Sequence, residues 1–198
     1  MTAAMVKAAL EATSAKIDPK DANPFRKGDA VVYPTHGVGH VKRVGFEEIA
    51  GHRLNLIVIS FEDNQMILRV PVAQARTAGL RKLGSRKTMA AALATLKGRP
   101  RISRLMWAKR SQEYLAKINT GNPSVLAEVV RDLQTAGDGS GSSFSQRNLF
   151  ELALERLAGE VAAVNRITRP DAVALINQTL VEARANSAIE RQRANLDG

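Results

Sequence analysis

The sequence contains no cysteine, few aromatic residues and no long apolar run. The absence of cysteine excludes disulfides, thiol nucleophiles and the common zinc-binding spacings. No apolar segment approaches the roughly 20 residues that a membrane-spanning helix needs, and charges interrupt residues 1–17 too often for a secretory signal. These absences predict a cytoplasmic protein without a membrane partner. Because only 4% of the residues are aromatic, each aromatic position is informative.

The net charge of +10 is concentrated in one stretch, residues 81–117. This stretch holds eleven basic residues and one acid, Glu113, and it contains the only tryptophan, Trp107. Elsewhere acids and bases balance, which predicts a neutral body with one cationic face that attracts a polyanion. The alternative is a solvated helix face around a core tryptophan. The basic residues on both sides of Trp107 favour nucleic acid, where the ring could stack on a base or wedge into an opened base step.

The sequence offers no catalytic or cofactor site. Gly79 to Gly84 has the first spacing of a phosphate-binding loop, but Ser85 stands where that loop needs lysine. His36 and His40 lie in a turn and strand context that does not aim both rings at one metal, and no third ligand is near. The acids occur as solvated pairs rather than as a buried dyad. We therefore predict a protein that is not an enzyme and holds no metal or cofactor.

Residues 25–71 have the short, Val- and Ile-rich pattern of β-strands. Turn signals at Pro34 to Gly37, Ala50-Gly51 and Asp63-Asn64 separate the strands. So few short strands are expected to form a small SH3/Tudor-like β-barrel. The expected strands are Ala30 to Tyr33, Gly39 to Phe46, Leu54 to Phe61 and Met66 to Val70.

After Arg81 the apolar period becomes helical. Asn122-Pro123 and Ser143 with Gln146 have the spacing of helix starts, and the tail from Asn186 is expected to fray. The apolar positions expected inside are Met89, Leu93, Leu96, Leu105, Tyr114, Leu115, Ile118, Leu126, Val129, Val130, Leu133, Phe150, Ala153, Leu154, Leu157, Val161, Val164, Val173, Ile176 and Leu180.

We predict an α+β protein, with the small barrel followed by an all-α helical domain. The expected segments are an N-terminal extension at 1–21, the barrel at 22–83, the helical domain at 84–166, and a C-terminal helix and tail at 167–198.

Both halves resemble one known family. The motif RKGDAVVYPTHGVG at 26–39, IAG at 49–51 and LRVP at 68–71 look like the RNA-polymerase-interacting domain of the CarD/CdnL transcription regulators, which also occurs in the transcription-repair coupling factor. WAKR at 107–110 and AEVVRDL at 127–133 resemble the helical DNA-binding domain of the same family. A coupling factor would need a helicase motor, which this chain is too short to contain.

The resemblance implies a non-catalytic regulator that binds the RNA polymerase β subunit and sits at the upstream edge of the promoter bubble. Trp107 matches the tryptophan that wedges into the minor groove and stabilises the open complex. Lys109, Arg110 and Arg147 match basic residues that hold the DNA backbone there, and Arg69 matches an arginine that contacts polymerase. Such a protein would associate with the nucleoid through RNA polymerase.

This chain departs from the family pattern at three places. Glu47 stands where some members have an arginine facing polymerase, Gln112 stands where some have a lysine near DNA, and residues 136–142 replace a charged segment. We expect Arg101 and Arg104, with Arg99, to compensate in binding DNA. No heptad seam predicts a dimer, so we expect a monomer when the protein is free.

A second hypothesis is an RNA-binding or ribosome-associated SH3-like module. RNA recognition would expose aromatic residues on the barrel to stack unpaired bases. Phe25, Tyr33, Phe46 and Phe61 are the candidates, although strand spacing places Tyr33 and Phe61 in the core.

Overall fold

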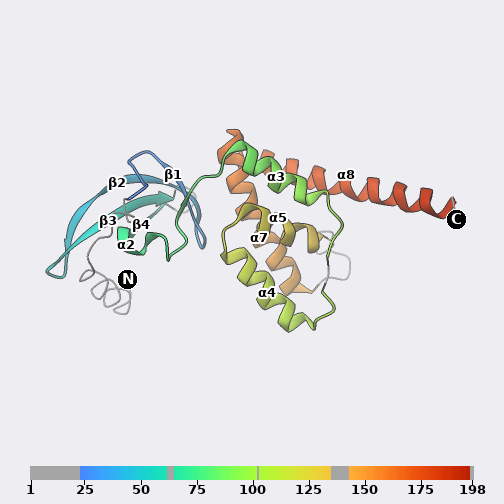
Figure 1. The fold of residues 1–198 in the computed structure, drawn as a ribbon, viewed down its shortest axis with the longest axis horizontal. Coiled ribbons are helices and arrows are strands. Elements are labelled where there is room, and N and C mark those ends of the chain that lie inside the picture. The colour runs from blue at the N-terminus through green and yellow to red at the C-terminus, as the bar shows by residue number, and fades with distance from the viewer. Residues whose placement is uncertain (1–22, 62–64, 102, 135–142, 197–198) are drawn as a thin grey trace. The chain divides into compact units, whose positions relative to one another are not determined.

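The computed structural model describes residues 23–61, 65–101, 103–134 and 143–196, apart from the side chains of 190, 191 and 193–196. The chain divides into two compact units, residues 1–83 and 84–198. The described part of the first is built mainly of strands and that of the second of helices (Figure 1). The predicted α+β class is confirmed. The predicted extension at 1–21 and the loop at 136–142 lie outside the described residues.

Strands of the first unit form an antiparallel sheet in the order β4-β3-β2-β1-β5. The described strands are β1 (Ala30–Tyr33), β2 (Gly37–Ile49), β3 (His52–Phe61), β4 (Met66–Pro71) and β5 (Arg81–Lys82). A short helix, α2 (Val72–Ala75), follows β4. The first four strands match the predicted ones, and β2 is longer at both ends. The sequence did not predict β5, because two residues carry no readable period.

Ala50 and Gly51 connect β2 to β3 in a two-residue hairpin closed by the pair of Ile49 and His52. Both turn residues have positive φ, 51° and 77°. A type I′ turn requires such a backbone, and its twist matches that of the two strands. The turn predicted here is confirmed, and it joins the two longest strands of the sheet, which are strongly curved in Figure 1.

The core of the first unit lies on one face of this sheet. Alternate residues of β3 supply its centre, and segments before β1 and after β4 add to it. Gly39 lies against the same core, because a Cβ there would come within 2.8 Å of Ile59 Cγ2 and 2.9 Å of the Phe61 ring. The buried members are Phe25, Val31, Val41, Ile57, Ile59, Phe61, Val70, Ala75 and Leu80.

Five helices of the second unit are described: α3 (Arg86–Leu96), α4 (Trp107–Asn119), α5 (Pro123–Asp132), α7 (Phe144–Asn165) and α8 (Arg169–Leu196). They enclose one apolar cluster, to which α5 contributes Leu126, Ala127, Val129 and Val130. The buried residues include Met89, Ala92, Leu96, Tyr114, Ile118, Leu126, Val129, Val130, Leu133, Phe150, Ala153, Leu157, Val161, Ala172, Ile176 and Leu180.

Side-chain caps begin three of these helices. Ser85 accepts a hydrogen bond from the Thr88 N–H and Asn122 from the Ser124 N–H. Ser143 and Gln146 form both hydrogen bonds of a capping box. These bonds satisfy backbone donors that a helix start leaves unpaired. The helix starts predicted at Asn122 and Ser143 are confirmed.

Two predictions for the helical unit were wrong, one about its core and one about its C-terminal tail. Leu105 and Leu115, expected in the core, are 43% and 44% exposed. Leu105 precedes α4 instead of lying in it, and the buried face of that helix follows Tyr114 and Ile118 instead. The predicted fraying from Asn186 is also wrong, because α8 continues to Leu196.

The first part of α8 packs into the core through Ala172, Ile176 and Leu180. No residue of α8 with a described side chain is buried beyond Leu180, and Figure 1 shows this end of the helix extending past the other helices of its unit. Among the described residues, no helix combines the length and the apolar character that crossing a membrane requires.

Candidate nucleic-acid interface

Trp107, the first residue of α4, is half-buried. Its ring packs against the core of the second unit, and its Nε1 donates a 2.8 Å hydrogen bond to Ser145 Oγ. Ser145 lies in the first turn of α7, and its hydroxyl is 3.1 Å from the Ser143 hydroxyl. The start of α7 therefore holds the indole in one orientation while part of the ring stays accessible.

Three of the predicted DNA-binding cations lie on the two helix turns that meet at Trp107. Arg110 Cζ is 5.5 Å from the centroid of the Trp107 ring, within cation–π range. Lys109 is exposed on the same turn, and Arg147 is exposed on the turn of α7 that carries Ser145. The first turns of α4 and α7 contain no acidic residue. A phosphate group beside either turn would therefore meet basic side chains and no carboxylate of that turn.

Arg101 and Arg104 have exposed side chains in the segment between α3 and α4. The backbone N–H of Arg101 donates to Asp132 Oδ1 at 2.8 Å. The same carboxylate oxygen accepts from Arg131 Nε at 2.9 Å and lies 2.8 Å from Arg131 Nη2. The chain is thus fastened to α5 at Arg101 while the side chains of both linker arginines reach solvent.

The basic stretch is divided between the two units. Its first residues form β5 in the first unit, and the rest belong to the second. Lys82 Nζ lies 2.9 Å from Asp29 Oδ2, and Lys117 Nζ lies 3.0 Å from Glu128 Oε2. Lys82 also lowers the pKa of the Asp29 carboxyl, chiefly through a hydrogen bond. Part of the positive charge is therefore matched locally by acids from outside the stretch.

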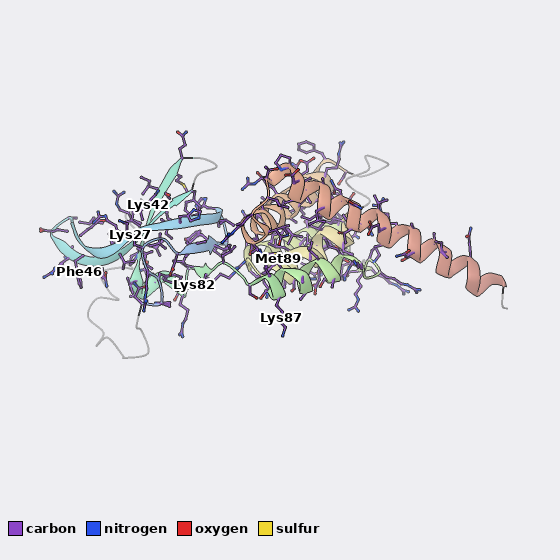
Figure 2. All side chains as sticks on the ribbon, turned by 90° about the horizontal axis from the view of Figure 1, so that it is seen from above. Lys27, Lys42, Phe46, Lys82, Lys87 and Met89 are labelled. Carbon is purple, nitrogen blue, oxygen red and sulfur yellow. The ribbon has the colours of Figure 1, made fainter. Side chains whose placement is uncertain are left out.

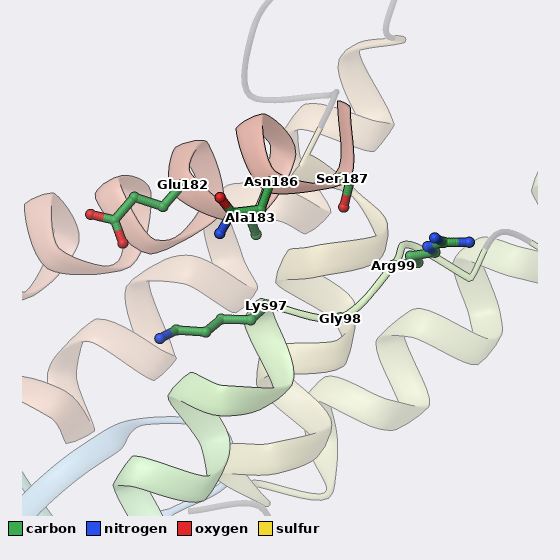
Figure 3. Close-up of a pocket in the computed structure, with 7 residues that line it drawn as sticks. All are labelled: Lys97, Gly98, Arg99, Glu182, Ala183, Asn186 and Ser187. Atoms are coloured by element: carbon green, nitrogen blue, oxygen red, sulfur yellow. The ribbon is translucent and has the colours of Figure 1, made fainter. Parts of the chain in front are cut away.

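A hollow of about 330 Å³ lies between the end of α3 and the second half of α8 (Figure 3). Lys97, Gly98 and Arg99 line one side, and α8 supplies Glu182 and small or polar side chains on the other. The lining carries both signs of charge. Of the residues predicted to bind DNA, Arg99 lines this hollow, but Trp107, Lys109, Arg110, Arg147, Arg101 and Arg104 do not, so we do not count it as part of the site around Trp107.

Arg69, predicted to contact polymerase, lies on β4 and is partly exposed. Its Nε is 3.4 Å from Glu47 Oε2, and Arg43 Nη2 lies 2.5 Å from Glu47 Oε1. Val58 on β3 is directly opposite both Arg43 and Arg69 in the strand register and is buried. Glu47, the departure noted in the sequence, therefore joins two arginines across the sheet and partly neutralises Arg69.

The aromatic residues of the first unit do not form a stacking surface. Phe25 and Phe61 are buried and Tyr33 is half-buried, whereas Phe46 is exposed. Figure 2 labels Phe46 near the end of the sheet where β2 and β3 turn, and Arg53 Cζ lies 4.7 Å from its ring centroid. Of the four aromatic candidates for RNA binding, Phe46 is therefore the one that is exposed, whereas stacking of several unpaired bases uses several exposed rings.

Sequence reasoning missed Ser145, which holds the Trp107 indole, and Asp132, which holds the backbone at Arg101. Ser145 lies between Ser143 and Gln146, and the capping-box pattern that identifies those two residues assigns no role to Ser145. Asp132 is the last residue of α5, and a short polar side chain is common at the end of a helix. Its identity therefore did not indicate a partner elsewhere in the chain. Pairings over 38 and 31 positions leave no periodic signal in one sequence.

The described residues contain no group of three or more His, Asp or Glu side chains placed to hold a metal ion. Residues 25–84 match the CarD-like/TRCF RID domain family, and residues 91–177 match the CarD C-terminal domain family. A Bacillus subtilis (strain 168) protein named "Putative transcription factor YdeB" is 25% identical over 144 residues, which are 73% of this chain and 94% of that protein. The two domain matches follow one another in the order expected from the sequence motifs, and the chain belongs to the CarD family.

Proposed function

We propose that this protein is a non-catalytic transcription regulator that binds the RNA polymerase β subunit through its first unit and promoter DNA through its second. Trp107 would then occupy the minor groove at the upstream edge of the bubble and stabilise the open complex. The observation that carries the proposal is the site around Trp107, where an immobilised, partly accessible indole lies on a helix turn shared with Lys109 and Arg110. The two domain matches support separate roles for the first unit in binding polymerase and for the second in binding DNA.

The arrangement suits recognition of DNA shape rather than of sequence. Arginine and lysine side chains around an apolar ring can neutralise phosphates and contact a deformed base step, without reading the edges of the bases. Such contacts are individually weak. Attachment to polymerase would raise the local concentration of the second unit near the promoter, so that weak contacts become sufficient.

The proposed effect on transcription follows from differential binding. A regulator shifts the balance between closed and open complexes only by as much as it binds the open form more tightly. An indole that contacts an unstacked step has this preference, because a fully stacked duplex offers it no such surface. The expected result is slower collapse of the bubble at promoters where collapse limits transcription.

Trp107→Ala tests the second unit. We expect a shorter open-complex half-life, measured by competitor challenge with the protein's own polymerase, while polymerase binding is retained. Leu115→Ala is the control, because it removes a large apolar side chain from the same helix at a position outside the predicted DNA-binding residues. An unchanged half-life with Trp107→Ala would refute the assignment of the wedge.

Arg69→Ala tests the first unit separately. We expect weaker capture of polymerase and weaker stabilisation of the open complex, with binding to free DNA unchanged. Capture of polymerase at wild-type strength would refute the assignment of Arg69.

A further inference from the structure

Two large apolar side chains project into solvent at the start of α4 and of α7. Met106, the residue before α4, is 80% exposed, and Phe144, the first residue of α7, is 73% exposed. They are the two most exposed large apolar side chains in the part of the chain that the structure describes. Solvent exposure at this level leaves most of their apolar surface available to a partner.

The hydrogen bond between Trp107 and Ser145 links the two segments that carry these residues. Met106 immediately precedes Trp107, and Phe144 immediately precedes Ser145, so the 2.8 Å bond joins the chain segments that carry them. The indole itself is half-buried, and the Arg110 guanidinium lies near its ring. Met106 and Phe144 therefore expose a larger fraction of their side chains at this site than Trp107 does.

The charges at this site indicate the occupant. Neither first turn contains an acid, whereas Lys109, Arg110 and Arg147 lie on them. Apolar side chains framed by cations suit a nucleic acid, whose phosphates meet the cations while its base faces meet the apolar groups. Phenylalanine and methionine are among the side chains that insert at opened base steps, because they bury apolar surface against the faces of the bases.

We propose that Met106 and Phe144 act with Trp107 as one composite wedge that contacts unstacked bases at a junction of double and single strands. Ser145 fixes the indole, which supplies the rigid centre, and the two exposed side chains widen the apolar contact on either side. This inference rests on the proposed function, because that function brings a DNA junction to the start of α4.

The test compares binding of the full-length protein to forked DNA and to a fully paired duplex of the same length at one low salt concentration. Phe144→Ala and the double change of Met106 and Phe144 to alanine are expected to weaken fork binding by about tenfold or more, as loss of one stacked base contact would. Duplex binding and the salt dependence of both affinities should stay as in the wild type, because the cations are intact. Val181→Ala, which changes an exposed apolar residue on α8, should have no effect.

Trp107→Ala separates failure of this inference from failure of the proposed function. If Trp107→Ala weakens fork binding and the Met106 and Phe144 variants do not, the composite wedge is refuted and the proposed function stands. If none of the three variants affects the preference for the fork, both are refuted. If the Phe144 variant weakens fork and duplex binding equally, Phe144 does not sense unstacked bases and the inference is refuted. Far-UV circular dichroism checks that each variant is folded.

Discussion

Asp132→Ala is expected to lower the free energy of unfolding of the second unit by about 3–5 kcal/mol. Asp132 is 5% exposed, and its Oδ1 accepts hydrogen bonds from the Arg101 backbone N–H and from Arg131 Nε. Arg131 is 7% exposed. Removal of the carboxylate leaves a buried guanidinium without its counter-charge, and that unpaired charge is the main cost. The total free energy of unfolding of a domain of this size is about 5–15 kcal/mol, so the expected loss is a large fraction of it.

A double variant isolates the cause of this loss. When Arg131→Met and Asp132→Leu are combined, neither charge of this buried pair remains and the apolar side chains can fill the space. Replacement of a whole buried ion pair by apolar residues is often neutral, so the double variant should be more stable than Asp132→Ala. The backbone N–H of Arg101 still loses its acceptor, which we expect to cost about 1 kcal/mol.

Urea unfolding followed by circular dichroism at helix wavelengths measures these differences, because the described helices belong almost entirely to the second unit. Glu128→Ala is the control. It removes a carboxylate from the partly exposed Lys117–Glu128 pair on α4 and α5, and such pairs are worth about 0–1 kcal/mol. If Asp132→Ala and Glu128→Ala destabilise the unit equally, Asp132 does not compensate a buried charge and the reasoning is wrong.

Three further outcomes are expected from the packing. Gly39→Ala should destabilise the first unit by about 1–3 kcal/mol, because the new Cβ would collide with Ile59 and Phe61; Gly45→Ala, where nothing lies within 4 Å, should cost far less in the same thermal unfolding assay. Ser143→Ala should cost about 1 kcal/mol by removing a helix cap, and an unchanged urea midpoint would contradict this. Burial raises the pKa of Tyr114 above its ordinary value of 10.0, so the unfolded chain releases this proton at lower pH than the folded one. Stability should therefore fall as pH rises above about 10, and Tyr114→Phe should reduce that fall in urea titrations at several pH values.

The helix starts and most of the core could be predicted because their signals are local. Asn122 with Pro123 and Ser143 with Gln146 specify helix starts within four residues, and the period of apolar residues identifies the buried side of each helix. The errors at Leu105 and Leu115 arose where apolar residues occur near the period of α4 but outside its packed side. Spacing alone does not say where a helix begins or which neighbour covers it.

The candidate site was likewise only partly predictable from the sequence. Trp107, Lys109 and Arg110 are close in sequence, so one stretch of charge pointed to them together. Arg147 was assigned through the resemblance to the CarD family, and the structure places it on the turn that carries Ser145. The neutralisation of Arg69 by Glu47 was not predicted, because it depends on the register of three strands.

The sequence by itself determined the β-rich first half, the helical second half, the family and the concentration of basic residues around one tryptophan. These properties depend on composition and on patterns within a few residues, which a single chain displays directly. Only the tertiary structure decided that Ser145 holds Trp107, that Asp132 fastens the chain at Arg101, and that the segments carrying the exposed Met106 and Phe144 are joined. Each of these depends on segments more than 30 positions apart, which are brought together by burial of a shared core and not by any local preference.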